Sequence, residues 1–420
     1  MKLRRKAKAG IVLIVLAALA CAALLRPSGP SFNGRDARAW ARELVAARSG
    51  ESHEQAMRAL RQLGPAAIPA LQEHLRRRDG IALDAVYQRL RSFDFFRHRV
   101  APARSRAMAA TALGALGPAG SSAIPDLVRA LGDARSYVAE CADSALRVFG
   151  HEAAAELTAS LASANDQQRR RALSILGALK PAPPAALPRL AALLDHADSQ
   201  TRALAASALI RFGPEAGFLA PRLAARLRDS APEARVEASA ALAAMDEKAA
   251  PAAAELAAAL RDPKESVRLN AAQALGKIGT RDSGIIRALA ASLSDRAVLV
   301  RSSAAQALGR IGPSSALALD ALAASLRDPE ESVRGAASQA LGRIGPKAAP
   351  ALPALMEALR RDSMPVKLSV VEALGGIGPP ARPYVPAILA EMANDYAALS
   401  RSVSAALRSI TPEKNYDLRE

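Results

Sequence analysis

Apolar residues recur along most of the chain at the spacing of an α-helix. The segment SVRGAASQALGRIG, which ends at Gly345, shows them at i, i+4, i+7, i+8 and i+11. Its apolar positions are Val333, Ala337, Ala340, Leu341 and Ile344. Residues at these intervals lie on one face of a helix, so the segment predicts a helix that buries one stripe.

A second apolar stripe follows directly in the next segment. Its positions, at i, i+3 and i+7, are Leu352, Leu355 and Leu359. Gly345 and Pro346 separate the two stripes, because glycine often ends a helix and proline cannot continue one. Pro350 and Pro353 fit the second helix only in its first turn, where backbone amides lack partners within the helix. The pattern therefore predicts a pair of antiparallel helices.

This pair of helices is repeated along the chain with a period of 33 residues. The corner residue of the repeat falls at Gly213, Asp246, Gly279, Gly312, Gly345, Gly378 and Thr411, and earlier at Lys180, Gly150, Gly117 and Gly64. These corners close about eleven units. Because so short a unit cannot bury both of its stripes alone, the units must stack, and the chain is predicted to be an all-α solenoid.

Two charged positions recur with the same period, an aspartate in the turn and an arginine six residues later. The best-aligned examples are Asp262, Arg268, Asp295, Arg301, Asp328 and Arg334. Such side chains can bond each other, nearby backbone groups or the next unit, which predicts a structural ladder along the stack. An anion-binding row is the alternative interpretation.

The repeated phrase resembles a known family. DPKESVRLNAAQALGKIGT at 262–280 and DPEESVRGAASQALGRIGP at 328–346 are similar to HEAT repeats of the short bacterial kind, which are related to those of phycobilisome-lyase-like proteins. The resemblance covers residues 99–411 clearly and 36–76 more loosely. It implies an α-solenoid that serves mainly as a binding and scaffolding surface, and it does not imply an activity.

The N-terminus predicts export or membrane attachment. MKLRRKAKAG is basic, and an uncharged stretch of about 17 residues runs from Ala9 to Leu25. This arrangement is typical of a signal segment or of a single anchor that places the following chain outside the cytoplasm. We expect an uncleaved anchor in a bacterial inner membrane. Lipidation at Cys21 after AALAC and secretion after ordinary signal cleavage remain alternatives.

The chain is expected to divide into five parts: the signal or anchor segment (1–30), N-terminal capping helices with a first repeat (31–76), an insertion (77–100), the repeat array (101–411) and a polar tail (412–420). In the capping segment, Asp36 is a plausible helix N-cap. Trp40 is expected to close the open end of the core.

Composition and the remaining polar residues argue against an enzyme. Only 3% of the residues are aromatic, and the five histidines are not paired at i, i+4 with a second metal ligand. The chain has no Gly-rich phosphate loop, and Cys141 has no candidate base nearby in sequence. We expect no cofactor, no small-molecule substrate and no nucleic acid, although the formal net charge is +17. Arginines account for most of that charge.

Two departures from the repeat are candidate partner-binding sites. The insertion combines arginines with aromatic residues, namely Arg89, Arg91, Phe93, Phe95, Phe96 and Arg97. Such a combination favours acidic or aromatic partners. The alternative is an extra helix whose phenylalanines pack onto the first repeats.

The second departure is a pair of polar rows on the helix that precedes each corner. One row contains Gln273, Gln306 and Gln339, and the other, four positions later in the repeat, contains Arg211, Lys277, Arg310 and Arg343. These helices line the concave side in HEAT-like arrays, so the rows would suit an extended peptide. A plain solvated face is the alternative. The sequence thus predicts a non-enzymatic, protein-binding scaffold outside the cytoplasm, and the alternative is an accessory lyase-like factor acting on a bound protein.

Overall fold

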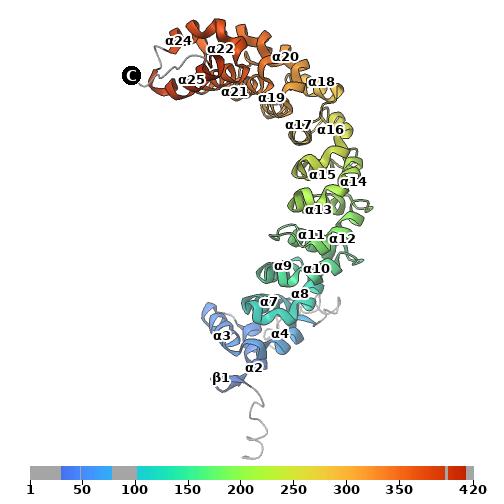
Figure 1. Ribbon diagram of the computed structural model, residues 1–420. Helices are drawn as coiled ribbons and strands as arrows, with labels where there is room; N and C mark the ends of the chain where they lie inside the picture. The colour runs from blue at the N-terminus through green and yellow to red at the C-terminus, as the bar shows by residue number, and fades with distance from the viewer. Residues whose placement is uncertain (1–29, 48, 78–101, 393–395, 413–420) are drawn as a thin grey trace, which may run out of the picture. The chain divides into compact units, whose positions relative to one another are not determined.

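Helices make up nearly all of the structure, a computed structural model that describes residues 30–47, 49–77, 102–392 and 396–412. The chain divides into two units, Met1–Leu179 and Lys180–Glu420. Within the described residues the only sheet is a two-stranded antiparallel ribbon near the N-terminus. Figure 1 shows the succession of helices along the chain.

The first unit contains the ribbon and the first helices. Its elements are β1 (Ser31–Phe32), β2 (Arg35–Asp36), α2 (Ala37–Ala46), α3 (Gly50–Leu63), η1 (Gly64–Ala67), α4 (Ile68–Leu75), α7 (Pro102–Ala115), η2 (Gly117–Ala123), α8 (Ile124–Ala130), α9 (Ser136–Phe149), η3 (Gly150–Ala153), α10 (Ala154–Ser160) and α11 (Asp166–Leu176).

The second unit repeats a longer helix, a 3₁₀ segment and a second helix. Its elements are η4 (Pro184–Ala186), α12 (Leu187–Leu193), α13 (Ser199–Leu209), η5 (Ile210–Leu219), α14 (Ala220–Arg226), α15 (Pro232–Ala244), η6 (Asp246–Ala252), α16 (Ala253–Ala259), α17 (Glu265–Ile278), α18 (Ser283–Ser292), α19 (Val298–Ile311), η7 (Gly312–Ala318), α20 (Leu319–Ser325), α21 (Glu331–Ile344), η8 (Gly345–Ala351), α22 (Leu352–Arg361), α23 (Met364–Ile377), η9 (Pro379–Tyr384), α24 (Val385–Met392) and α25 (Tyr396–Ile410).

Two layers of helices form the second unit. The odd-numbered helices α13 to α25 pack against one another in sequence, and the even-numbered helices α14 to α20 form the other layer. Within this unit, Figure 1 shows the odd-numbered helices on the inner side of the curve and the even-numbered helices on the outer side. The predicted solenoid of paired helices is therefore the observed architecture.

The corners of the repeat follow the predicted positions. Gly345 adopts a φ of 77° at the end of α21, a backbone conformation that favours glycine. The non-glycine corner residue Asp246 adopts a φ of 52°. The chain then continues into a 3₁₀ segment, so Pro350 lies inside η8, whereas Pro353 is in the first turn of α22. The prediction that both prolines lie in the first turn of the helix was wrong for Pro350.

The core lies between the two layers and is built from leucine, alanine and β-branched residues. All residues of the two predicted stripes are buried, namely Val333, Ala337, Ala340, Leu341, Ile344, Leu352, Leu355 and Leu359. Alanines keep the helices close together, and leucines fill the space between the layers. Stacking repeats therefore removes from water the apolar faces that a single unit leaves exposed.

The N-terminal end is closed by a small motif around Trp40. This side chain is 1% exposed, and its Nε1 donates a hydrogen bond to the carbonyl of Phe32 at 3.0 Å. Arg35 lies over the indole ring at 5.2 Å from its centroid. Asp36 is the N-cap of α2 and accepts from the amide of Ala39 at 2.8 Å. The β-ribbon that holds Phe32 and Arg35 was not predicted.

Two sequence predictions fall on residues that the structure does not describe. The signal or anchor segment lies within 1–29, and the insertion from 78 to 100 lies within 78–101. Among the described residues, none of the helices has the length and apolar character needed to cross a bilayer. The membrane anchor and the insertion therefore stay predictions.

Candidate functional site

An arginine–aspartate ladder connects successive repeats. In each step, Nε and Nη2 of the arginine donate to both carboxylate oxygens of an aspartate in the next repeat, with the arginine and aspartate 27 or 28 residues apart. The pairs are Arg106–Asp133, Arg202–Asp229, Arg235–Asp262, Arg268–Asp295, Arg301–Asp328 and Arg334–Asp362. The sequence left three kinds of partner open for these arginines. In the structure they bond the aspartate of the next repeat and nearby backbone carbonyls.

The third nitrogen of each ladder arginine is also used. Nη1 of Arg268 donates to the carbonyl of Asp262 at 2.8 Å, in the turn of its own repeat. With Nε and Nη2 on Asp295, all three nitrogens of the guanidinium group have partners. The ladder is therefore saturated, and this geometry favours the structural interpretation over an anion-binding row.

Pairing sets the charge state of the ladder carboxylates. The hydrogen bonds from Arg202 hold the pKa of Asp229 below its usual value, although burial of the carboxylate opposes this shift. The pKa of Arg202 is raised by the same pair. Both groups are thus charged at neutral pH, and neither is poised for proton transfer.

The polar rows predicted from the sequence lie side by side on three neighbouring helices. Gln273 and Lys277 are on α17, Gln306 and Arg310 on α19, and Gln339 and Arg343 on α21. All six side chains are exposed. Because α19 packs against both α17 and α21, the six residues form one surface, which we call the Gln–Arg strip.

Glycines beneath the strip allow its helices to approach closely. A Cβ atom on Gly276 would lie 2.7 Å from Cα of Ala307, and one on Gly309 would lie 2.9 Å from Cα of Ala340. Real Cβ atoms do not come that close to backbone atoms, so α17, α19 and α21 can pack at this distance only with glycine there. Each glycine immediately precedes the cation of the strip.

Two neighbouring hollows lie along the strip. One, of about 230 Å³, is lined by residues of α17 and α19, including Gln273, Lys277, Gln306 and Arg310. The other, of about 540 Å³, is lined by α19, α21 and α23 and includes both Gln306 and Gln339. Gln306 lines both hollows, so they are neighbours, and we call the pair of hollows the groove. Glu330 and Glu331 lie in the wall of the second hollow.

The three cations of the strip differ in the hydrogen bonds and ion pairs that they make. Nζ of Lys277 donates to the carbonyl of Ala243 at 2.7 Å and pairs with Asp246 at 2.9 Å, so this lysine caps the preceding helix α15. Arg310 and Arg343 form no hydrogen bond or ion pair with any residue that the structure describes. The guanidinium groups of these two arginines are therefore available to a ligand.

The strip ends at α23. There the glutamine position holds Glu372 and the cation position holds Gly376, both exposed. The chemistry of the groove thus changes after three repeats, while the fold continues without interruption into α25. Because the repeat continues without these glutamines and cations, the fold does not need them.

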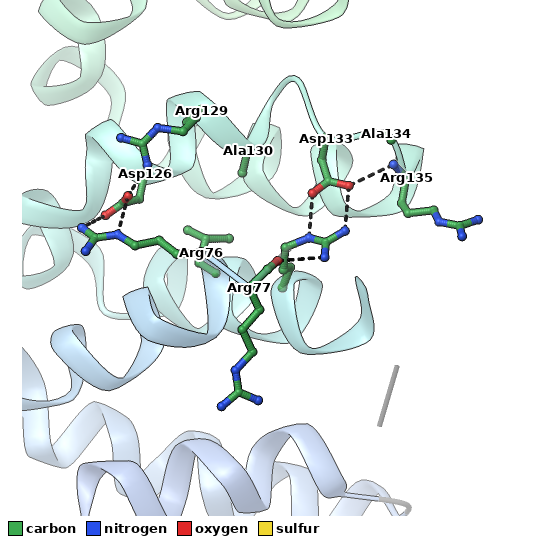
Figure 2. A pocket seen from close by; sticks show the side chains of 10 residues that line it. Arg76, Arg77, Asp126, Arg129, Ala130, Asp133, Ala134 and Arg135 are labelled. Atoms are coloured by element: carbon green, nitrogen blue, oxygen red, sulfur yellow. Dashed lines mark hydrogen bonds and ion pairs between the residues drawn. The ribbon is translucent and has the colours of Figure 1, made fainter. Parts of the chain in front are cut away.

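Sequence reasoning missed a second cluster of charged residues, in the first unit. Asp126 on α8 is buried and accepts hydrogen bonds from Arg76 at 2.9 and 2.7 Å and from Arg129 at 2.6 Å (Figure 2). Nε2 of Gln72 adds a further bond at 2.9 Å. The sequence did contain a signal for this cluster. Asp126 directly precedes the buried Leu127, whereas the equivalent position of the preceding repeat, before Leu71, holds Ala70.

The remaining candidate residues give no chemical site in the described part of the chain. The predicted partner-binding residues Arg89, Arg91, Phe93, Phe95, Phe96 and Arg97 lie outside the described residues. Within the described ranges, no group of three or more histidine, cysteine, aspartate or glutamate side chains could hold a metal ion. His74 is buried against the hydroxyl of Ser105 at 2.7 Å, and burial lowers its pKa.

Comparison with known proteins supports the repeat assignment. A family model of HEAT repeats matches residues 219–308, 253–328 and 319–408. A model of the PBS lyase HEAT-like repeat matches residues 53–77 and 105–133. The two repeat models together cover more than half of the chain. No curated protein matches the sequence.

A solved structure shows the same fold. The crystal structure of an engineered protein is 21% identical, with a TM-score of 0.50, covering 82% of this chain and 99% of its own. A second engineered protein is 23% identical over 46% of this chain and 96% of its own, with a TM-score of 0.41. The two family models lead to one conclusion: the chain belongs to the HEAT-repeat proteins, with repeats of the phycobilisome-lyase-like type among its units.

Proposed function

We propose that this protein is a non-enzymatic scaffold that binds an extended segment of a partner protein along the Gln–Arg strip. The observation that carries the proposal is that Arg310 and Arg343, on the exposed strip beside the two hollows that share Gln306, have no partner among the described residues. Arginine without a partner is a common anchor at protein interfaces, and HEAT repeats suggest a protein-interaction scaffold.

The spacing of the strip fits an extended peptide. Packed helices lie about 8–10 Å apart, so successive glutamines and arginines repeat at about that distance along the groove. A polyproline II helix advances about 9 Å in each three-residue turn. A partner segment in this conformation would present one side chain to each helix. The glutamines would bond its backbone, and Arg310 and Arg343 would pair with acidic side chains.

The location of the scaffold is also part of the proposal. The basic N-terminus followed by the apolar stretch from Ala9 to Leu25 supports attachment to a bacterial inner membrane, with the repeats on the extracytoplasmic side. Lipidation at Cys21 and signal cleavage are the alternative fates of this segment. The folded body contains a single cysteine, Cys141, which is free, so its stability rests on packing and on the ladder.

Quantitative capture of membrane partners tests the proposed function. The full chain and the double variant Arg310→Gln/Arg343→Gln would be used to capture crosslinked proteins from native membranes. The matched control is Arg287→Gln/Lys347→Gln, which removes the same charge from exposed positions on α18 and η8. We expect the strip variant to lose its specific partners and the control to retain them. An unchanged set of partners in the strip variant would refute the proposal.

A further inference from the structure

The last of the odd-numbered helices, α25, ends at the edge of its layer where the arginines of the Gln–Arg strip lie. In the strip, an arginine precedes the corner of its repeat by two positions, as Arg343 precedes Gly345. Thr411 is the corner position of the last repeat and directly follows α25. The chain therefore leaves the last helix at the level of the strip arginines.

Two helix spacings separate this point from Arg343. Helix α25 packs against α23, α23 against α21, and α21 against α19. At about 8–10 Å for each packed pair, Arg343 on α21 lies about 16–20 Å from α25, and Arg310 on α19 lies about 24–30 Å from it. Residues 413–420, which we call the C-terminal segment, lie outside the described residues. An extended chain advances about 3.3 Å per residue, so these residues span about 26 Å and can pass both arginines.

Charged residues recur at every third position of the C-terminal segment. Lys414 is positive, and Asp417 and Glu420 are negative. A chain in the polyproline II conformation advances about 9 Å in three residues, which is also the spacing of packed helices. Such a chain presents every third side chain on one side, so these three would face successive helices. Glu413 and Arg419 would face another direction.

Exposed charges on the neighbouring helices follow the same order with opposite signs. Helix α23 has Glu372 in the glutamine position, and α21 and α19 have Arg343 and Arg310 in the cation position. Like the two arginines, Glu372 forms no hydrogen bond or ion pair with any residue that the structure describes. The charge on the helices changes sign between α23 and α21, and the charge of the segment changes sign between Lys414 and Asp417.

The C-terminal segment is too short to pass beyond α19. The next helix, α17, lies four spacings from α25, about 32–40 Å away, which is more than the segment can span. Its cation, Lys277, is already bonded to the carbonyl of Ala243 and to Asp246. The two strip arginines that have no partner among the described residues are thus on the helices that the segment can reach.

We propose that the C-terminal segment binds along the groove of its own chain and blocks it. The proposed ion pairs are Lys414–Glu372, Asp417–Arg343 and Glu420–Arg310. The segment runs from α25 across α23 and α21 to α19, the helices that line the larger hollow of the groove. This inference deepens the proposed function and rests on it, because the segment competes with the partner for the same two arginines.

The bound segment is held weakly enough for a partner to displace it. Each exposed ion pair changes an equilibrium by no more than about fivefold, so a free peptide of this sequence would bind poorly. The short connection to α25 raises the local concentration of the segment to about the millimolar range, which compensates for the weak pairs. Salt at about 1 M should release the segment, since it screens exposed charges.

Carbodiimide crosslinking of the full chain in nonionic detergent micelles tests where the segment binds. The reagent joins a carboxylate to a lysine amine in contact with it, so each strip arginine is replaced by lysine in turn. In Arg343→Lys the expected crosslink is to Asp417, and in Arg310→Lys it is to Glu420, as identified by mass spectrometry. The matched control Arg287→Lys, at an exposed position of α18, should give neither crosslink.

Two comparisons test the register of the pairs. Glu372→Gln restores the residue type of the neighbouring repeats, so the fold is kept. Because it removes the partner of Lys414, it should lower the yield of the Arg343→Lys crosslink about threefold. Glu413 has the same charge as Asp417 but faces another direction, so it should crosslink to the new lysine at least about threefold less.

An equal mixture of unlabelled and isotope-labelled chains shows whether the segment binds its own chain. Each crosslinked pair of peptides should carry a single label. The inference would be overturned by the absence of crosslinks from both lysines, by equal crosslinking from Arg287→Lys, by a crosslink to Glu413 as frequent as that to Asp417, or by crosslinked peptides that combine both labels.

Capture from native membranes tests the competition with a partner. Asp417→Asn/Glu420→Gln should capture about threefold more of the partners that Arg310→Gln/Arg343→Gln loses, whereas the control Glu413→Gln should not. Unchanged capture by the first variant would refute the competition. If the crosslinks fail while the strip variant still loses its partners, this inference fails and the proposed function stands. If the crosslinks form while the strip variant keeps its partners, the proposed function fails and the binding of the segment stands.

Discussion

Removing one arginine from the ladder should destabilise two neighbouring repeats. Arg268 and Asp295 are 6% and 12% exposed at their side chains. The substitution Arg268→Ala removes both bonds to the carboxylate of Asp295 and leaves it with a single backbone donor, the amide of Ala297. Breaking a buried ion pair by removing one partner costs about 3–5 kcal/mol, because the remaining charge is left without compensation in a poorly solvated place.

Hydrogen exchange measured by mass spectrometry suits this perturbation better than global unfolding. Repeats interact with their neighbours only, so the loss should be confined to the helices that the pair connects, α17 and α19. A cost of about 3 kcal/mol or more corresponds to amide exchange on the order of a hundredfold faster in those helices. Peptides from α23 should keep their protection.

Two further variants test whether the unpaired charge of Asp295 causes the faster exchange. In Arg268→Met/Asp295→Asn the unpaired charge is gone, and the asparagine can still accept from the amide of Ala297, so most of the protection should return. Arg327→Ala, which removes an exposed pair with Glu357, should leave exchange unchanged. If Arg268→Ala exchanges no faster than Arg327→Ala, the ladder is not a buried brace and the account of it is wrong.

Three further predictions concern pH, packing and the groove. Pairing lowers the pKa of Asp229 in the folded chain, so the stability that this carboxylate contributes is complete above about pH 4 and is lost as the pH falls below that. Thermal unfolding followed from pH 7 to pH 3 should show this loss of stability. The loss should be smaller in Asp229→Asn. Gly309→Ala should lower the unfolding temperature, since its Cβ would meet Ala340. Gly335→Ala, whose Cβ would make only an ordinary contact with Ser369 at 3.8 Å, should raise it slightly. For the strip, binding of acidic peptides should prefer glutamates at every third position over the same composition at every second position, as measured by competition.

The period of the sequence accounts for most of the fold. A 33-residue spacing of corners, together with stripes such as Val333 to Ile344, was enough to predict stacked helix pairs. The same period placed Gln306 and Arg310 on the helix layer where the structure has them. Local chemistry also identified Asp36 as an N-cap, because a short polar side chain before an apolar helix has few other uses.

Contacts between distant positions could not be read from the sequence in the same way. The ladder partner of Arg268 is Asp295 in the next repeat, whereas Asp262, nearer in sequence, offers only its carbonyl. Choosing between them requires the distance between stacked turns. Asp126 was missed for a related reason, because its donors Arg76 and Gln72 lie about 50 residues away.

Two further features could be recognised only from side-chain contacts in the folded chain: the N-terminal ribbon, and which cations of the strip are free to bind a ligand. Two strands of two residues give no periodic signal, and the bond from Trp40 to Phe32 shows their purpose only once the chain is folded. Lys277 and Arg310 look equivalent in the repeat, yet Lys277 caps α15 and Arg310 has no partner among the described residues. That difference decides which cation a ligand can use.

Site-specific photocrosslinking from the groove tests the central claim most directly. A photoreactive residue placed at Gln306, which lines both hollows of the groove, should crosslink a partner protein in native membranes. The same residue at the exposed Arg287 on α18 should not. The Gln306 crosslink should disappear when Arg310 and Arg343 are replaced by glutamine. Equal crosslinking from both positions, or a Gln306 crosslink that persists without the two arginines, would contradict the account.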